Sequence, residues 1–254
     1  MPAEFNIALA DTVIGVRAEY ESTRRFCRDF ISSASPDFRV EISEEDIRYE
    51  RLMAAKEAET EGKQAVNYED AYLETLAVCR KAAEILPAFD TILFHGSAIS
   101  VEGEAFIFAA KSGTGKSTQA RLWREYFGEA AVMINDDKPL LKISGNEVRV
   151  YGSPWNGKHQ LGGNISAPLK AIAILERAEE NRISPLDKRS ALPMLCQQSY
   201  RPRKAESLAK TMELIDRLGT GVKLCKLGCN MEPEAVTTAY GVMSGKNECP
   251  PGQP

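Results

Sequence analysis

Residues 110–118, Ala-Lys-Ser-Gly-Thr-Gly-Lys-Ser-Thr, have the residue types and the spacing of a phosphate-binding loop. Such a loop turns several backbone N–H groups toward phosphate oxygens, and Gly113 and Gly115 allow that turn with no side chain in the way. Lys116 adds a positive point charge beside the same anion. These residues predict the binding of a phosphorylated ligand and the transfer of one of its phosphate groups.

The predicted nucleotide-binding residues are seven consecutive members of this loop: Ser112, Gly113, Thr114, Gly115, Lys116, Ser117 and Thr118. The hydroxyl of Ser117 is predicted to bind Mg²⁺, because it occupies the last position of the G-x-x-x-x-G-K-[ST] pattern. Ala110 departs from that pattern, which has glycine there. The alternative interpretation is a chance loop of small polar residues.

Two carboxylates follow the next apolar run of the chain. Asp136 and Asp137 end the strand expected over residues 131–135, where nucleotide-binding folds place the carboxylate that holds Mg²⁺ or orients the nucleophile. Successive side chains of a strand point to opposite faces, so only one of the two is expected to face the phosphates directly. The alternative is a pair that stabilises a turn.

The chain has only two histidines, and both fall in segments expected near the nucleotide. His95 lies on the strand expected over residues 91–100, where a buried structural histidine is the alternative. His159 lies in a Gly-rich loop, residues 155–164, that is predicted to contact the phosphate acceptor. The predicted contact residues of that loop are Trp155, Asn156, Lys158 and His159, and the alternatives are a loop that serves the nucleotide and a purely structural loop.

The elements around these residues can be placed from their patterns. The apolar run 105–109 predicts a buried strand that enters the 110–118 loop, and the apolar spacing over residues 118–127 predicts a helix that leaves it. The turn at Glu102-Gly103 joins the 91–100 strand to the entering strand as a hairpin. Residues 140–143 and 148–151 predict a second hairpin.

Three segments are predicted along the chain. Residues 1–87 read as a small α+β element, residues 88–244 as a P-loop catalytic domain and residues 245–254 as a flexible tail. Within the first segment, residues 43–64 are dense in charge and predict a solvated helix or a mobile excursion, with a binding surface as the alternative. The fold class expected for the whole chain is α/β.

Composition excludes several classes of protein. The chain has 254 residues with a net charge of −4, which argues against a dedicated nucleic-acid binder. No apolar stretch approaches the roughly 20 residues of a membrane span, and residues 1–4 lack the basic start of a signal peptide, so a cytoplasmic protein with no membrane association is expected. Six cysteines without a C-x-x-C pair suggest neither a zinc site nor a disulfide framework.

Three features in this order and spacing, His95-Gly96, the run 112–117 and Asp136-Asp137, resemble the catalytic domain of bacterial HPr kinase/phosphorylase. That family shares its mixed-sheet P-loop nucleotide-binding fold with phosphoenolpyruvate carboxykinase, and the resemblance covers about residues 88–180. It implies that Lys116 binds the transferred phosphate, that Asp137 is the general base on the acceptor hydroxyl and that His95 assists it. It also implies that Ser117 holds the metal and that Asp136 either binds the metal or supports its ligands.

The resemblance implies an ATP- and Mg²⁺-dependent kinase whose acceptor is a serine- or threonine-type hydroxyl of a protein or peptide. Small relatives of this family occur in peptide-modification pathways, so a peptide serine is a reasonable acceptor, and homo-oligomers are compatible with it. The family's metal-binding Glu has no clear counterpart in this sequence. The alternatives are a carboxykinase-like lyase and a catalytically inactive nucleotide-binding regulatory module. The choice between ATP, GTP and pyrophosphate stays open.

Overall fold

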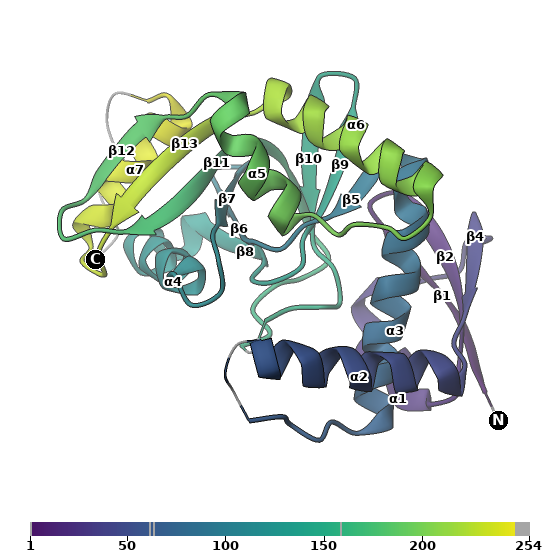
Figure 1. Cartoon of the computed structure of the whole chain (residues 1–254). Coiled ribbons are helices and arrows are strands. Elements are labelled where there is room, and N and C mark those ends of the chain that lie inside the picture. The colour runs from purple at the N-terminus through teal and green to yellow at the C-terminus, as the bar shows by residue number, and fades with distance from the viewer. Residues whose placement is uncertain (1, 61, 63, 158, 247–254) are drawn as a thin grey trace. The chain divides into compact units, whose positions relative to one another are not determined.

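A computed structural model describes residues 2–60, 62, 64–157 and 159–246. The chain forms two compact units, Met1–Ile85 and Leu86–Pro254 (Figure 1). Each unit combines helices with a sheet, so the expectation of a mixed α/β protein is confirmed at this level. The assignment of the units as an N-terminal element and a catalytic domain stays a prediction.

The first unit contains, in its described part, a four-stranded sheet of order β3-β1-β2-β4. Its strands are β1 (Ala3–Leu9), β2 (Thr12–Ala18), β3 (Ile31–Ser32) and β4 (Phe38–Glu41). Its helices are α1 (Glu21–Phe26), the 3₁₀ turn η1 (Arg28–Phe30), α2 (Glu44–Thr60) and α3 (Asp70–Ile85). α1 ends at Phe26, and η1 carries the chain into β3.

A buried carboxylate joins α3 to the start of α1. Glu74 of α3 has no exposed surface, and it accepts hydrogen bonds from the backbone N–H of Glu19 (2.6 Å) and of Tyr20 (3.1 Å). The Thr23 hydroxyl donates a third hydrogen bond. Because a buried carboxylate is tolerated only when its oxygens are paired, these donors are what keeps Glu74 compatible with the core.

Within the charged segment over residues 43–64, the structure forms the helix α2 from Glu44 to Thr60, and one face of this helix packs against α3. Asp46 and Glu50 of α2 form ion pairs with Arg80 of α3, and Lys81 also pairs with Asp46. The side chains of Asp46, Glu50 and Arg80 are only 11–15% exposed. Burial raises the pKa of Asp46, but the hydrogen bonds from Lys81, Arg80 and Ser43 outweigh it, and the pKa lies well below its ordinary value.

Arg80→Leu is expected to destabilise the first unit by about 3 kcal/mol, because it leaves two half-buried carboxylates without their shared partner. The folded state of the wild type binds fewer protons at Asp46 than the unfolded state does. The stabilisation is therefore complete above the ordinary carboxyl pKa of about 4, and it is lost as pH falls further, toward the lowered folded-state pKa. Urea unfolding of the full chain at pH 7 and pH 3 measures both effects.

Arg48→Leu is the matched control, because Arg48 is an exposed arginine of α2, the other helix of this contact. It should change the free energy of unfolding by less than about 0.5 kcal/mol. Equal losses in the two variants, or an Arg80→Leu chain that keeps the wild-type pH dependence, would contradict this account of the α2–α3 contact.

The second unit is built on a nine-stranded sheet in the part of the chain that the structure describes. Its strands are β5 (Thr91–Leu93), β6 (Ser97–Val101), β7 (Glu104–Ala109), β8 (Ala131–Asn135), β9 (Leu140–Ser144), β10 (Glu147–Tyr151), β11 (Ser166–Arg177), β12 (Arg182–Pro185) and β13 (Lys223–Cys229). The order is β5-β9-β10-β11-β7-β6-β8, and β13 pairs with β11 and with β12. Most neighbours are antiparallel, but β11 runs parallel to both β7 and β13.

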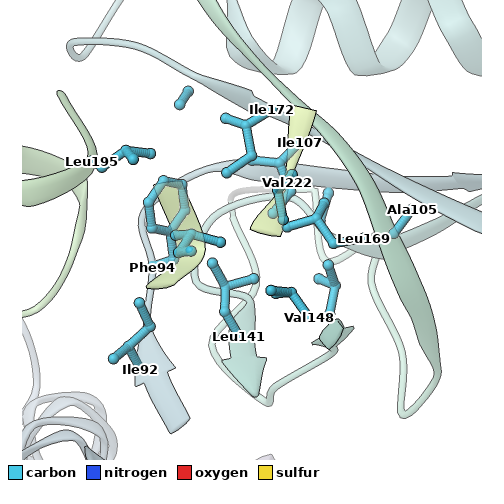
Figure 2. Packing of buried hydrophobic residues seen from close by; sticks show 14 of the residues in the cluster. Ile92, Phe94, Ala105, Ile107, Leu141, Val148, Leu169, Ile172, Leu195 and Val222 are labelled. Carbon is cyan, nitrogen blue, oxygen red and sulfur yellow. The ribbon is translucent and has the colours of Figure 1, made fainter. Parts of the chain in front are cut away.

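Helices cover both faces of this sheet (Figure 1). They are α4 (Lys116–Phe127), α5 (Lys188–Gln198), α6 (Ala205–Gly221) and α7 (Glu234–Ser244), with 3₁₀ turns η2 (Leu86–Phe89) and η3 (Gly128–Ala130). Alternate residues of β7 serve the two faces: Ile107 packs in the cluster that contains α5 and α6, and Phe106 and Phe108 pack in the cluster that contains α4 and α7. Figure 2 shows the first cluster, where Phe94, Leu141 and Leu195 converge.

The expected strand over residues 91–100 is interrupted at His95-Gly96. β5 pairs with β9, whereas β6 pairs with β7 and β8, so the chain steps from one set of partners to another between them. Gly96 passes so close to β7 that a Cβ there would lie 3.0 Å from Ile107 Cγ2 and 3.1 Å from the Phe108 carbonyl oxygen. The histidine therefore lies in a bend rather than in a regular strand. β12, which pairs with β13, was not expected from the sequence.

Candidate functional site

The 110–118 loop connects β7 to α4, as the sequence predicts. Gly113 and Gly115 have φ angles of +75° and +129°, and a Cβ at either position would meet no described atom within 4 Å. Glycine is needed there for backbone conformation, and the space in front of the loop is open. Gly115 is the N-cap of α4 and makes no side-chain capping hydrogen bond, which leaves the first N–H groups of the helix available to an anion.

The side chain of Lys116 lies against Ala110, the first residue of the 110–118 loop. Its Nζ donates to the Ala110 carbonyl oxygen at 3.0 Å, and the residue is 9% exposed. Burial lowers the pKa of the Lys116 ammonium, and the negative charge of Asp137 opposes that shift. The ammonium is therefore held at the loop, near the carboxylate of Asp137, which follows β8.

The turn after β8 is fixed by a buried asparagine. The Oδ1 of Asn135 accepts from the backbone N–H of Asp137 (2.9 Å) and of Lys138 (2.6 Å). Its Nδ2 donates to the hydroxyl of Ser153 at 3.1 Å, and that hydroxyl donates to the Lys138 carbonyl oxygen at 2.6 Å. This network orients the two aspartates before any ligand is present.

Asp137 lies between two nitrogen groups. Its Oδ1 is 3.3 Å from His95 Nε2, and its Oδ2 is 2.5 Å from Lys138 Nζ. The Gly96 N–H donates to the Asp137 carbonyl oxygen at 3.1 Å, which holds the His95 bend against this turn. The structure therefore brings His95 and Asp137 together, with Lys116 near enough to respond to the aspartate charge. Sequence reasoning missed Lys138, although its position directly after the aspartates was the available signal.

Asp136 faces a different neighbour. Its Oδ1 accepts from the Gly157 N–H at 2.6 Å, and a Cβ at Gly157 would lie 2.8 Å from its Oδ2. The residue is 7% exposed, and it lines a cavity together with Ser117. The two aspartates thus serve different surroundings, as strand alternation predicts.

This cavity has a volume of about 450 Å³, and it is called the acceptor-side cavity because its lining includes His159, which the sequence predicts to contact the acceptor. The charged and polar residues that line it include Ser117, Asp136, His159, Arg121 and Arg124. Apolar parts of the wall come from Ala120, Met133 and Leu161. It combines metal-compatible oxygen atoms with cations and an apolar surface.

The residues predicted to contact the acceptor occupy different places. Trp155 is 3% exposed and therefore packs in the interior, whereas His159 lines the acceptor-side cavity. Asn156 Nδ2 donates to the Ser153 carbonyl oxygen at 3.3 Å. Lys158 lies outside the described residues.

The glycines of this loop allow close packing against β8. A Cβ at Gly162 would lie 2.6 Å from the Ile134 carbonyl oxygen, and one at Gly152 would lie 1.8 Å from the Gly163 carbonyl oxygen. These contacts explain the glycines, since no larger residue fits where the loop crosses the strand end.

The donor set fits Mg²⁺ bound together with phosphate oxygens. Mg²⁺ at phosphate sites commonly takes only one or two protein oxygens, and Ser117 and Asp136 offer these on one cavity wall. Among the described residues, no group of three or more His, Cys, Asp or Glu side chains is placed to hold a metal ion.

The described helices include none that has both the length and the apolar character of a membrane span.

A family model described as "SynChlorMet cassette protein ScmC" matches residues 63–217, which is more than half of the chain. The chain belongs to the ScmC family. The range shared with ScmC includes His95, the 110–118 loop and both aspartates, and it ends within α6. The matching family is ScmC and not the HPr kinase/phosphorylase family that the motifs resemble.

A search of curated proteins finds no match to this ScmC-family chain. Among solved structures, "Structure of the Hpr(Ser) kinase/phosphatase from Coxiella burnetii" matches with 9% sequence identity and a TM-score of 0.34. The match covers 61% of this chain and 96% of that one. A likeness of this degree is distant, and the site is interpreted from the residues of the ScmC-family chain itself.

Proposed function

We propose that this protein is an ATP- and Mg²⁺-dependent phosphotransferase that phosphorylates a serine- or threonine-type hydroxyl of a protein or peptide. The observation that carries the proposal is the convergence of three groups at the 110–118 loop. The ammonium of Lys116 interacts electrostatically with the carboxylate of Asp137, and the Oδ1 of Asp137 lies 3.3 Å from His95 Nε2. Phosphate binding alone requires no carboxylate–imidazole pair at the loop, whereas transfer to a hydroxyl requires a group that accepts a proton.

The phosphates of the nucleotide would lie on the loop backbone and the first turn of α4. Lys116 would exchange its hydrogen bond to Ala110 for one to the transferred phosphate, and would stabilise the charge that develops there. Ser117 and Asp136 would hold Mg²⁺, which neutralises phosphate charge when it is bound. ATP and Mg²⁺ are the expected cofactors.

Proton transfer falls to Asp137 in this proposal. The acceptor oxygen forms the new bond to the γ-phosphorus, the bond to the bridging oxygen breaks, and the nucleoside diphosphate leaves with the bond's electron pair. The hydroxyl proton moves to Oδ1 of Asp137, the oxygen with the longer contact, since Oδ2 lies 2.5 Å from Lys138 Nζ. His95 Nε2, 3.3 Å from that Oδ1, holds the carboxylate in place.

The body of the acceptor would lie in the acceptor-side cavity, whose lining includes Asp136 but not Asp137, and its reacting hydroxyl would extend past the cavity to Asp137. Arg124 gives this cavity a cationic side and Leu161 gives it an apolar one, whereas Arg121 is paired with Glu125 at 2.7 Å. A peptide segment with apolar and acidic side chains next to its serine fits that combination. The family description names a cassette, so proteins and peptides encoded beside the gene are the first acceptors to test.

The test uses ATP labelled at the γ-phosphate, Mg²⁺, and each neighbouring gene product as a separate acceptor. We expect acid-stable, alkali-labile label on serine with the wild type, and a loss of about 10²-fold or more with Lys116→Met. Lys204→Met is the control, since Lys204 is an exposed N-cap residue of α6 that lines neither the loop nor the cavity.

Two other outcomes lead to different functions. Label only on free amino acids or sugars would refute the protein or peptide acceptor while keeping the kinase. Nucleotide-dependent conversion of oxaloacetate without labelled protein would favour the carboxykinase-like lyase instead.

A further inference from the structure

A second cavity lies on the other side of the 110–118 loop. It has a volume of about 410 Å³ and is here called the strand-end cavity. Its walls are residues 113–115 of the loop, Gln119 of α4, and the chain that follows β11 and β13, at Arg177, Ala178, Asn230 and Met231. No residue assigned to Mg²⁺ or to proton transfer lines it.

The sheet explains why this cavity exists. β7, β11 and β13 are parallel neighbours, so their carboxyl ends meet at one edge, and the three segments that follow them surround the cavity. In α/β sheets this edge is the usual position of a ligand. β8, which carries the aspartates, lies on the opposite side of β7, beyond β6. The loop thus separates a side with carboxylates from a side without them.

The wall of the strand-end cavity is held rigidly. Asn230 Nδ2 donates to the Glu179 carbonyl oxygen at 2.9 Å, and Asn230 exchanges two 2.9 Å hydrogen bonds with the Asn181 side chain. The Ala178 N–H also donates to the Cys229 carbonyl oxygen at 3.1 Å. Because these hydrogen bonds need no ligand, the cavity is formed in advance, which lowers the entropy lost on binding.

The chemistry of the wall suits a nucleoside. Gln119 is fully buried, its Nε2 donates to the Asn230 carbonyl oxygen at 3.3 Å, and its Oε1 accepts no hydrogen bond within the described part of the chain. An unpaired buried acceptor is costly, and a base amino group or a ribose hydroxyl is a suitable donor. Met231 is 74% exposed, and its flexible apolar side chain can pack against a flat ring. Arg177 donates to the Gly113 carbonyl oxygen at 2.6 Å and brings a positive charge to the loop.

We infer that the strand-end cavity binds the base and ribose of a nucleoside triphosphate whose phosphates lie on the 110–118 loop. The inference rests on the proposed phosphotransferase function. In this arrangement the loop lies between the two substrates. The nucleoside is at the ends of β11 and β13, and the acceptor is in the acceptor-side cavity. The inference also selects a nucleotide over pyrophosphate as the phosphate donor.

The experiment compares the affinities for ATP and for inorganic tripolyphosphate, both with Mg²⁺, by calorimetry on the full chain. The wild type should bind ATP about tenfold or more tightly than tripolyphosphate. Ala178→Phe puts a ring into the strand-end cavity and should weaken ATP by about tenfold while changing tripolyphosphate by less than about twofold. Ala130→Phe is the control at an exposed alanine of η3 that lines neither cavity, and it should change neither affinity.

Met231→Ala is the second variant, because truncating a mostly exposed side chain does not strain the fold. It should weaken ATP by roughly threefold and leave tripolyphosphate unchanged, and it decides the question alone if Ala178→Phe does not fold. The inference is overturned if wild-type affinities for the two ligands are equal, or if the variants weaken both ligands alike. If the wild type binds neither ATP nor tripolyphosphate, the proposed phosphotransferase function is refuted, and the inference that rests on it is refuted as well. Tripolyphosphate binding without a nucleoside advantage overturns only the assignment of this cavity.

Discussion

Lys116→Ala is expected to lower the rate of phosphate transfer by about 10²–10³, the usual effect of removing one electrostatic contact to a developing phosphate charge. The fold should survive the change. Lys116 is nearly buried, and its ammonium donates a hydrogen bond to the Ala110 carbonyl oxygen. Its burial already disfavours the charge, as the lowered pKa shows, so losing that charge should not reduce the free energy of unfolding by much.

Turnover and thermal unfolding measured on the same preparation check this expectation. Lys116→Met keeps most of the side-chain volume, and so it separates the loss of charge from the loss of packing. A rate within about a factor of three of the wild type would refute the role of Lys116 at the transferred phosphate.

Asp137→Asn is expected to reduce transfer by about 10²–10⁴ while nucleotide binding is kept. The amide is nearly isosteric with the carboxylate, but it cannot take the acceptor's proton. Asp136→Asn should be milder, because the asparagine Oδ1 can still accept from the Gly157 N–H and can still be a metal ligand.

Nucleotide titration and turnover are measured side by side for the two variants. Equal defects in turnover would show that the assignment of the two aspartates to different roles is wrong. A loss of nucleotide affinity in Asp137→Asn but not in Asp136→Asn would mean that the roles are exchanged.

The local parts of this structure could be predicted because their signals lie within a few residues. The apolar run before Ala110, the glycines after it and the helical spacing around Trp123 specify β7, the loop and α4 in one continuous stretch. The second hairpin, now β9 and β10, was equally readable from its flanking runs and its Ser-Gly-Asn-Glu turn. The mixed α/β class followed from these elements, whereas the nucleotide, the metal and the acceptor remain proposals.

The contacts that could not be predicted join residues far apart in sequence. Gln119 meets Asn230 and Glu102 meets Tyr240, and no pattern within either segment identifies its partner. The same holds for the parallel pairing of β7 with β11 and of β11 with β13, which creates the strand-end cavity. Trp155 was misleading for a related reason, since a tryptophan in a polar, Gly-rich loop looks exposed until the loop is seen to pack on β8.

Asn135 limits how this site can vary in evolution. One end of its side chain accepts two backbone N–H groups, and the other end donates to Ser153, so both halves of the amide are in use. Aspartate lacks the donor, serine lacks the reach, and glutamine adds a methylene group where the residue has no exposed surface. Substitutions at exposed neighbours such as Val132 should therefore be tolerated. A substitution of Asn135 removes hydrogen bonds that stabilise the turn carrying both aspartates.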